Sequence, residues 1–251
     1  MDGIVSLAIA TLLLLTIVKF YLPKSEVEHT EGLKIVSINL LSSNQEYEKV
    51  ISFIKEEDFD IVFFQELNMS WEAKLDELRE EYPNQNMIPR SDNFGIGVLS
   101  KLEFINVEDL DLSTVQISSI LMKVNYKGKE LSVLSTHPLP PVGNYYFESR
   151  NKQFKSISKF VDAYSSELIV IGDLNSTKFS PNFDLLYKSG KLRDSREGFG
   201  LQPTWNAQWS LISITLDDVL VTNGIQILDR GIGPNIGSDH LPVTIEVSWK
   251  E

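Results

Sequence analysis

Short apolar runs that end abruptly in polar side chains recur along this chain, and they constrain its fold more than any other feature. A buried strand has to end somewhere polar, so one such ending is ordinary. Here the polar endings are repeated at Asn39, Gln65-Glu66, His137, Asp173 with Asn175, and Asp239-His240, and Asp217 lies inside a further apolar run. A loop at the end of a strand can present its side chains to a ligand while the strand holds them in place. The pattern predicts a site that is assembled from strand ends.

Helical patterns lie between these runs. Apolar residues recur at helical spacing over 47–54, 71–82 and 157–164, which predicts three amphipathic helices. Two β-rich runs, 118–126 and 129–136, are separated by a Lys-Gly turn and predict a hairpin. Strands with interspersed helices and hairpins indicate a mixed α/β domain.

Length and composition limit the class of protein. A chain of 251 residues, 42% of them hydrophobic, can bury the core of one large domain or of two small ones. Its formal net charge of −12 disfavours a generic nucleic-acid-binding protein that relies on phosphate contacts. The chain has no cysteine, which excludes disulfides and thiolate zinc sites. Both a merely acidic surface and a site that gathers divalent cations agree with this composition.

The N-terminal stretch 4–22 is apolar except for Lys19, and its length is close to the ~20 residues of a membrane-spanning helix. We predict a single-pass membrane anchor over 1–22, although an uncleaved signal sequence or a buried core helix would show a similar pattern. A cleaved signal peptide is disfavoured because only Asp2, and no basic segment, precedes the apolar run.

The remainder of the chain is expected to form one catalytic domain. Residues 23–32 are polar and aperiodic, which indicates a linker, and the domain is predicted over 33–251. Lys19 and Lys24 flank the C-terminal side of the apolar stretch, so the positive-inside rule favours a cytoplasmic location for this domain.

The residue types at the strand ends suit metal-dependent chemistry. Carboxylate and amide oxygens are hard ligands for Mg²⁺ or Mn²⁺, and histidines beside such an ion suit proton transfer or neutralisation of phosphoryl charge. Of the three histidines, His137 and His240 lie in these loops, whereas His29 falls in the linker and has no assigned role. Zinc hydrolases usually show histidines at close helical spacing, and the sequence has no His-Glu-x-x-His pattern.

The strand-end motifs occur in a fixed order along the chain: Asn39, Gln65-Glu66, Ser135-Thr136-His137, Gly172-Asp173-Leu174-Asn175, Leu216-Asp217 and Gly237-Ser238-Asp239-His240. This set resembles the endonuclease/exonuclease/phosphatase family, which includes deoxyribonuclease-like nucleases, apurinic endonucleases, sphingomyelinases and inositol polyphosphate phosphatases. Each motif alone is weak, but six in the right order are specific, and the resemblance covers about residues 33–248. It implies an α/β fold, a four-layer α/β/β/α sandwich of two mixed β-sheets with outer helices, preceded here by an apolar N-terminal helix.

The same resemblance implies a metal site and a catalytic set. Glu66 is expected to be the principal ligand of Mg²⁺ or Mn²⁺, with Asn39 beside it and Asp239 contributing directly or through water.

The catalytic roles follow from the same motifs. Asp173 is expected to orient or deprotonate the attacking water, and Asn175 to hold the phosphate. His240 is expected to contact the scissile phosphate and to be oriented by Asp217. His137 is expected to stabilise the developing charge or to help protonate the leaving group.

Some positions depart from the family pattern or carry less certain roles. Asp218 stands where the family more often has a histidine or an aromatic residue, and we expect it at the surface or supporting a loop. The proline-rich segment after His137 resembles a bacterial, membrane-associated branch of the family. Arg150 is a candidate phosphate ligand, although a helix-surface arginine is an equal alternative. Trp205 is a candidate for lining the substrate groove, although a core or lid tryptophan is the commoner role.

The sequence therefore predicts a Mg²⁺- or Mn²⁺-dependent phosphoester hydrolase, foremost a phosphodiesterase that uses an activated water. A membrane anchor would favour a lipid headgroup or a small phosphodiester as substrate. A nuclease acting on DNA or RNA, a phosphomonoesterase of the inositol-phosphate type, and a catalytically inactive, membrane-tethered binding module are the alternatives. No protein partner can be inferred.

Overall fold

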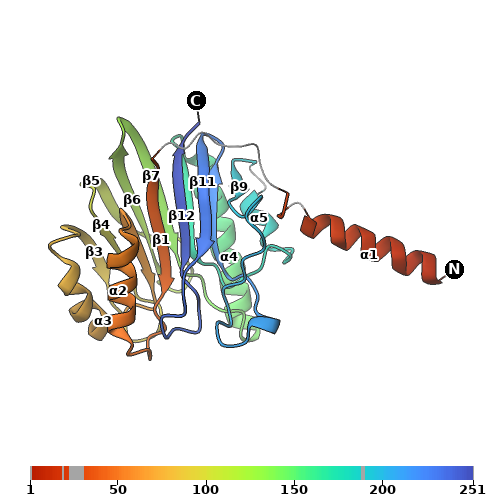
Figure 1. Cartoon of the computed structure of the whole chain (residues 1–251), viewed down its shortest axis with the longest axis horizontal. Coiled ribbons are helices and arrows are strands. Elements are labelled where there is room, and N and C mark those ends of the chain that lie inside the picture. The colour runs from red at the N-terminus through yellow and green to blue at the C-terminus, as the bar shows by residue number, and fades with distance from the viewer. Residues whose placement is uncertain (1, 19, 23–30, 188–189, 251) are drawn as a thin grey trace.

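A computed structural model describes residues 2–18, 20–22, 31–187 and 190–250 of the chain. Its strands form two six-stranded sheets (Figure 1). In spatial order, the first sheet contains β11 (Ile225–Ile232), β12 (Val243–Trp249), β1 (Leu33–Asn39), β2 (Ile61–Gln65), β4 (Ile96–Ser100) and β3 (Asn84–Ile88). The second sheet contains β5 (Phe104–Asp111), β6 (Ser118–Tyr126), β7 (Lys129–Thr136), β8 (Leu168–Asp173), β10 (Asp217–Thr222) and β9 (Leu192–Asp194). The helices are α1 (Asp2–Val18), α2 (Tyr47–Glu57), α3 (Met69–Leu75), α4 (Gly143–Ala163) and α5 (Asp184–Tyr187), with 3₁₀ turns η1 (Asp76–Leu78) and η2 (Ser210–Ile212).

The two sheets pack face to face, and helices cover their outer faces. Alternate residues of the strands, such as Phe63 in the first sheet and Ile171 in the second, meet in one buried apolar cluster between the sheets. A second cluster lies between the first sheet and α2 with α3, and a third lies between the second sheet and α4 with α5. The predicted four-layer α/β/β/α sandwich is therefore confirmed.

Strand direction brings the polar endings to one rim. β1 and β2 run parallel, as do β7 and β8, so each pair ends at the same edge of its sheet. β10 runs antiparallel to β8 and begins with Asp217 directly opposite Asp173. β12 begins beside the end of β1, with Val243 paired to Ser37, so the preceding turn lies at the same rim.

The predicted helices and strands occur, with some shifts in their bounds. α4 begins at Gly143, well before the apolar stripe that starts at 157. The sequence pattern missed the first half of this helix because that half carries polar and exposed aromatic side chains rather than an apolar stripe. β3 and β5 were not predicted individually. All five residues of β3 are only half-buried, so this edge strand carries no strong apolar signal.

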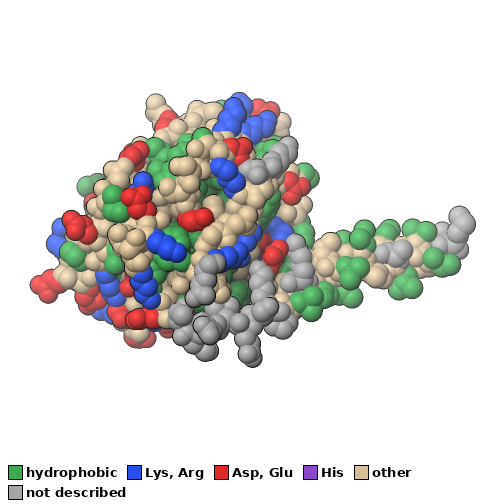
Figure 2. All heavy atoms as spheres, turned by 90° about the horizontal axis from the view of Figure 1, so that it is seen from above, with side chains coloured by type: hydrophobic (Ala, Val, Ile, Leu, Met, Phe, Trp, Pro, Cys, Tyr) green, Lys and Arg blue, Asp and Glu red, His purple; other side chains and the backbone are tan. Residues whose placement is uncertain are grey.

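The N-terminal helix α1 projects from the sandwich (Figure 1), and its described side chains are largely exposed (Figure 2). Within the described part of the chain, no helix combines the length and apolar character needed to cross a membrane, so the predicted spanning helix over 1–22 is not supported. The predicted linker 23–32 falls mostly on residues 23–30, which lie outside the described part.

Two residues after the end of α1, Phe20 packs against the sandwich. Its side chain is fully buried, and its carbonyl oxygen accepts hydrogen bonds from the backbone N–H groups of Gly198 and Gly200 at 3.1 and 2.8 Å. The ammonium of Lys178 lies 4.1 Å from the centroid of its ring. The domain therefore includes contacts from a residue that the sequence placed in the anchor.

Candidate active site

Asp173, the last residue of β8, lies at the centre of the polar rim and is 1% exposed. Its Oδ2 accepts a hydrogen bond from Asn39 Nδ2 at 3.1 Å and faces His137 Nε2 at 3.4 Å and His240 Nε2 at 3.7 Å. Its Oδ1 accepts the backbone N–H of Asn175 at 2.8 Å. The structure thus brings five of the predicted site residues into one group from both sheets.

A glycine before Asp173 makes this close arrangement possible. Gly172 has a φ of +138°, and a Cβ atom at this position would lie 2.2 Å from the backbone oxygen of Thr136. Any other residue would push β8 away from the end of β7. Because His137 follows Thr136 directly, the glycine keeps His137 beside Asp173.

His240 is held between two carboxylates. Its Nδ1 lies 2.8 Å from Asp217 Oδ2, and its Nε2 faces Asp173. Burial by itself disfavours the imidazolium, but the charges of Asp217 and Asp173 and the hydrogen bond to Asp217 outweigh it and raise the pKa of His240 to about 10. The predicted orientation of His240 by Asp217 is present, and the ring is a cation at neutral pH.

Asp173 is the anionic partner of this cation. Burial raises the pKa of a carboxyl group, but the charge of His240 and the hydrogen bond from His137 more than offset that effect, so the pKa of Asp173 is lowered. Asp173 therefore stays ionised although it is almost completely buried.

Glu66 directly follows β2 and has a left-handed backbone with a φ of +56°. This conformation is uncommon for a residue with a Cβ and often marks a functional position. Its Oε2 accepts the backbone N–H of Ser42 at 3.0 Å, while Asn39 Nδ2 lies 3.4 Å from Oε1. One carboxylate oxygen is thus held by Ser42 and the other has only a long contact.

The Asn39 amide shows a different orientation from the one that metal ligation requires. Its nitrogen faces Glu66 and Asp173, and its oxygen accepts the backbone N–H of Leu41 at 3.0 Å. Only the oxygen can coordinate a cation. In this structure Asn39 bridges two carboxylates, and its role as a metal ligand stays a prediction.

Asp239 is positioned by the loop that carries Trp205. Trp205 Nε1 donates to Asp239 Oδ2 at 3.0 Å, and Ala207 N–H donates to the Asp239 carbonyl oxygen at 2.8 Å. Asp239 Oδ1 is buried and has no hydrogen-bond partner among the described residues. Trp205 thus contacts this carboxylate, and its role in lining a substrate groove stays a prediction.

Asn175 and Arg150 are also coupled. Asn175 has a φ of +49°, and its Nδ2 donates to the carbonyl oxygen of Pro138 at 3.0 Å. Arg150 in α4 is buried, and its Nη1 donates to the carbonyl oxygen of Asn175 at 2.8 Å. Burial lowers the pKa of Arg150. The exposed helix-surface position is excluded for Arg150, which supports the backbone of the Asn175 turn.

Three of these residues have ligand atoms within 4.8 Å of one another: Asp173, Asp217 and His240. That spacing suits a metal ion, although His240 Nδ1 already lies 2.8 Å from Asp217 Oδ2. Glu66 Oε1 has only a long contact, and Asp239 Oδ1 has no hydrogen-bond partner among the described residues. The predicted roles of these residues in metal binding and catalysis stay predictions.

Comparison with known proteins agrees with this geometry. Residues 36–240 match the Endonuclease/Exonuclease/phosphatase family. The chain belongs to this family. No curated protein sequence matches it.

Solved structures of the family share the fold. TDP2 from D. rerio complexed with single strand DNA product is 16% identical, with a TM-score of 0.72 over 87% of this chain and 100% of that one. An endonuclease/exonuclease/phosphatase family protein from Leptotrichia buccalis is 16% identical, with a TM-score of 0.69 over 87% and 100% of the two chains. Sphingomyelinase C from Streptomyces griseocarneus is 18% identical, with a TM-score of 0.61 over 86% and 99%.

Asp218, the departure from the family pattern, is fully buried, so the surface alternative predicted for it is wrong. Its Oδ1 lies 3.1 Å from Nη2 of Arg196 in the turn after β9, which agrees with the alternative of a carboxylate that supports a loop. Successive residues of a strand point to opposite faces, so Asp217 turns toward the rim and Asp218 toward the outer face of the second sheet. The local sequence pattern around Asp218 contains no signal for its pairing with Arg196.

Two residues of the site were missed by sequence reasoning. Ser42 holds Glu66, and the ring of Phe94 lies 5.5 Å, centroid to centroid, from that of His137. Ser42 follows the first polar strand ending, which was an available signal. Phe94 lies in another loop, and only folding places it beside His137.

Proposed function

We propose that this member of the endonuclease/exonuclease/phosphatase family is a Mg²⁺- or Mn²⁺-dependent phosphodiesterase that uses a water molecule as nucleophile. The observation that carries the proposal is the buried carboxylate Asp173, which stays ionised between two histidines beside Glu66. A salt bridge that only stabilises the fold does not require two histidines, an amide and further carboxylates gathered at one rim. The arrangement matches the needs of phosphoryl transfer.

The residues present fit a divalent cation. Asp239 Oδ1 is buried without a partner among the described residues, and Glu66 Oε1 has only the long contact to Asn39. A hard cation satisfies such oxygens. Glu66 and Asp239 would hold it, with the Asn39 oxygen after rotation of its amide. When bound, the ion supplies neutralisation of charge on a non-bridging phosphate oxygen.

The remaining residues would act on the water and the phosphate. Asp173 orients the water in line with the scissile bond and accepts its proton as the new P–O bond forms. His240, kept protonated by Asp217, stabilises charge on the phosphoryl oxygens. His137 stabilises the leaving oxygen or helps to protonate it, and the products are a phosphomonoester and an alcohol. Asn175 holds a phosphate oxygen through its side-chain amide, with Arg150 supporting its backbone.

The net charge of the chain and the ligands or names of similar solved structures bear on the class of substrate. TDP2 was solved with a single strand DNA product, which keeps a nuclease as the second candidate. The formal charge of −12 disfavours tight binding of a polyanion, and a relative that is a sphingomyelinase supports a lipid or small phosphodiester instead.

The first experiment is an assay of the full chain with bis-(p-nitrophenyl) phosphate and with the corresponding monoester, in Mg²⁺, Mn²⁺ or EDTA. We expect turnover of the diester that requires the metal and is lost in Glu66→Ala and in His240→Ala. Asp76→Ala, which removes an exposed carboxylate in η1, is the matched control and should retain full activity.

Metal binding by calorimetry separates the two possible cation positions. Glu66→Ala should abolish Mg²⁺ binding, whereas Asp217→Asn should leave it within a few-fold. The reverse result would place the ion at the Asp173–Asp217–His240 group. Absence of both metal binding and hydrolysis, also on DNA, phospholipid and inositol phosphates, would favour a binding module without catalysis.

A further inference from the structure

The loop that orients Asp239 carries an exposed apolar tip. Trp209 is 64% exposed, Leu211 100% and Ile212 71%, in and beside η2. The tip is ordered by backbone hydrogen bonds from Trp209 N–H to the Asn206 carbonyl oxygen at 3.1 Å and from Ile212 N–H to the Trp209 carbonyl oxygen at 3.0 Å. Apolar side chains held outward on an ordered turn are costly in water unless something covers them.

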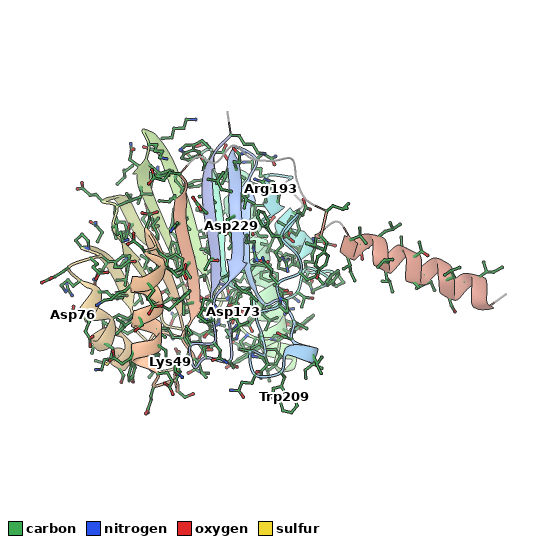
Figure 3. All side chains as sticks on the ribbon, viewed as in Figure 1. Lys49, Asp76, Asp173, Arg193, Trp209 and Asp229 are labelled. Atoms are coloured by element: carbon green, nitrogen blue, oxygen red, sulfur yellow. The ribbon has the colours of Figure 1, made fainter. Side chains whose placement is uncertain are left out.

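The base of this loop is part of the active site. Trp205 pairs in isolated bridges with Ile214 on one side and with His240 on the other, and its Nε1 holds Asp239. Figure 3 shows Trp209 at the outer edge of the same end of the sandwich as Asp173. Whatever covers the tip therefore also lies against the opening of the site.

A second apolar group lies at the start of α4, directly after the loop that carries His137. Val142, at the start of the helix, is 73% exposed and Tyr145 is 66% exposed, and Phe147 shows more than a third of its surface. The guanidinium of Arg150 lies 5.2 Å from the centroid of the Phe147 ring and binds the Asn175 carbonyl oxygen. Phe147 is thus linked to the Asn175 turn of the site through Arg150. The loop of the η2 tip is linked to the site through Trp205.

The chemistry of these two groups points to one kind of occupant. Both groups adjoin loops of the site, so a surface that covers them also faces the site and can bring a phosphoester to it. A lipid–water interface does both, because its headgroups carry phosphodiesters above an apolar layer. Tryptophan and tyrosine favour that interface. The net charge of −12 favours zwitterionic over anionic headgroups and disfavours nucleic acid.

We propose that these six residues form an apolar rim that docks the active site onto a zwitterionic phospholipid surface: Trp209, Leu211 and Ile212 with Val142, Tyr145 and Phe147. The proposal rests on the proposed phosphodiesterase and names its substrate as a lipid headgroup. The rim acts beside the site and leaves the reacting groups unchanged.

The test compares the full chain with a variant carrying Trp209→Ser, Leu211→Ser and Ile212→Ser. Water-soluble phosphorus released from phosphatidylcholine vesicles is measured beside hydrolysis of bis-(p-nitrophenyl) phosphate. We expect vesicle turnover to fall at least about tenfold, as burial of these side chains is lost, while the soluble diester is hydrolysed within about twofold of the wild-type rate. Leu211→Trp alone should raise vesicle turnover.

Ile105→Ser in β5 is the matched control, since Ile105 is 50% exposed but lies at the end of β5 opposite the rim. It should leave the ratio of vesicle to soluble turnover unchanged. Unchanged vesicle turnover in the triple variant would overturn the proposal. Equal loss on both substrates would also overturn it, because the loop would then serve only to hold Asp239.

A binding assay keeps the inference separate from the proposed activity. If neither ester is hydrolysed, the phosphodiesterase fails, and cosedimentation with phosphatidylcholine vesicles still tests the rim. Loss of cosedimentation in the triple variant supports docking. Equal binding by both proteins, or loss of single-stranded DNA binding instead, would contradict it.

Discussion

Two buried ionic clusters lie on opposite faces of β10, and consecutive residues belong to them. Asp217 joins the rim cluster with Asp173, His137 and His240. Asp218 joins what we call the arginine cluster, which contains Asp194, Asp218, Arg196 and Arg230. Both clusters pair carboxylates with basic side chains at similar burial, so burial and charge type alone do not tell a catalytic site from a structural one.

The two clusters differ in which physical effect sets the charge. At His240, the two carboxylates outweigh burial and keep the ring protonated, with a pKa of about 10. At Asp218, burial outweighs the attraction of Arg196 and raises the pKa to about 7. Arg196 is already engaged by Asp194, through Nε at 3.0 Å and Nη2 at 2.9 Å.

The difference also lies in what the basic groups can do. Arginine stays charged and binds Asp194 with a rigid fork, which suits a permanent internal contact. Histidine can exchange a proton and turns one nitrogen toward the rim, which suits chemistry on a bound phosphate. The basic partner, more than the buried carboxylate, therefore separates a catalytic role from a structural one.

The largest effect is expected from matched asparagine substitutions in the two clusters. Asp173→Asn should lower kcat on the diester by about 10³-fold, because the group that orients and deprotonates water is lost. Asp218→Asn should leave kcat within about threefold. Steady-state kinetics measure kcat of both variants, and circular dichroism checks that both are folded. Comparable losses in the two variants would show that the clusters are not functionally distinct.

The next effect concerns stability. Arg196→Met should lower the free energy of unfolding by about 3–5 kcal/mol, because Asp194 and Asp218 lose their shared buried cation. Arg79→Met removes an exposed pair with Asp76 and should cost less than about 1 kcal/mol. Urea unfolding gives both values. If Arg196→Met costs no more than Arg79→Met, the arginine cluster is not a stabilising element.

A smaller effect is expected at the edge of the rim cluster. Trp205→Phe removes the N–H donor to Asp239 Oδ2 and should weaken Mg²⁺ binding about tenfold, since groups that orient a metal ligand tune its affinity. Trp249→Phe removes a comparable indole hydrogen bond, to the carbonyl oxygen of Tyr126 at the end of β6, and should leave the affinity unchanged. Calorimetric titration distinguishes them. Equal affinities for both variants would contradict a role for Trp205 in positioning Asp239.

A pH dependence of stability without metal is expected from His240. The pKa of His240 in the folded state, about 10, exceeds the ordinary histidine value of 6.5, so the folded state retains a proton that the unfolded state loses between these values. Its contribution to stability is complete below pH 6.5 and is lost as pH rises through about 10. Urea unfolding between pH 6 and 10 should show this decline, and His240→Asn should remove most of it. An identical slope in that variant would refute the charged state of His240.

The sequence alone determined a mixed α/β domain and the members of the rim cluster, whereas the layered sandwich was implied by the family resemblance. Buried strands produce apolar runs with helices between them, and polar residues at the ends of such runs have no reason in packing, so both signals are local. Asn39, Glu66, His137, Asp173 and His240 could each be named from a place at a strand end, and the resemblance supplied their expected roles.

Only the tertiary structure decided which polar residues face each other and what surrounds them. It turned Asp217 toward His240 and Asp218 toward Arg196, placed Arg150 under the Asn175 turn, and gave Trp205 to Asp239. These outcomes depend on the face of a strand and on partners distant in the chain. A local pattern carries no record of such partners, because burial and pairing arise only when the two sheets close on each other.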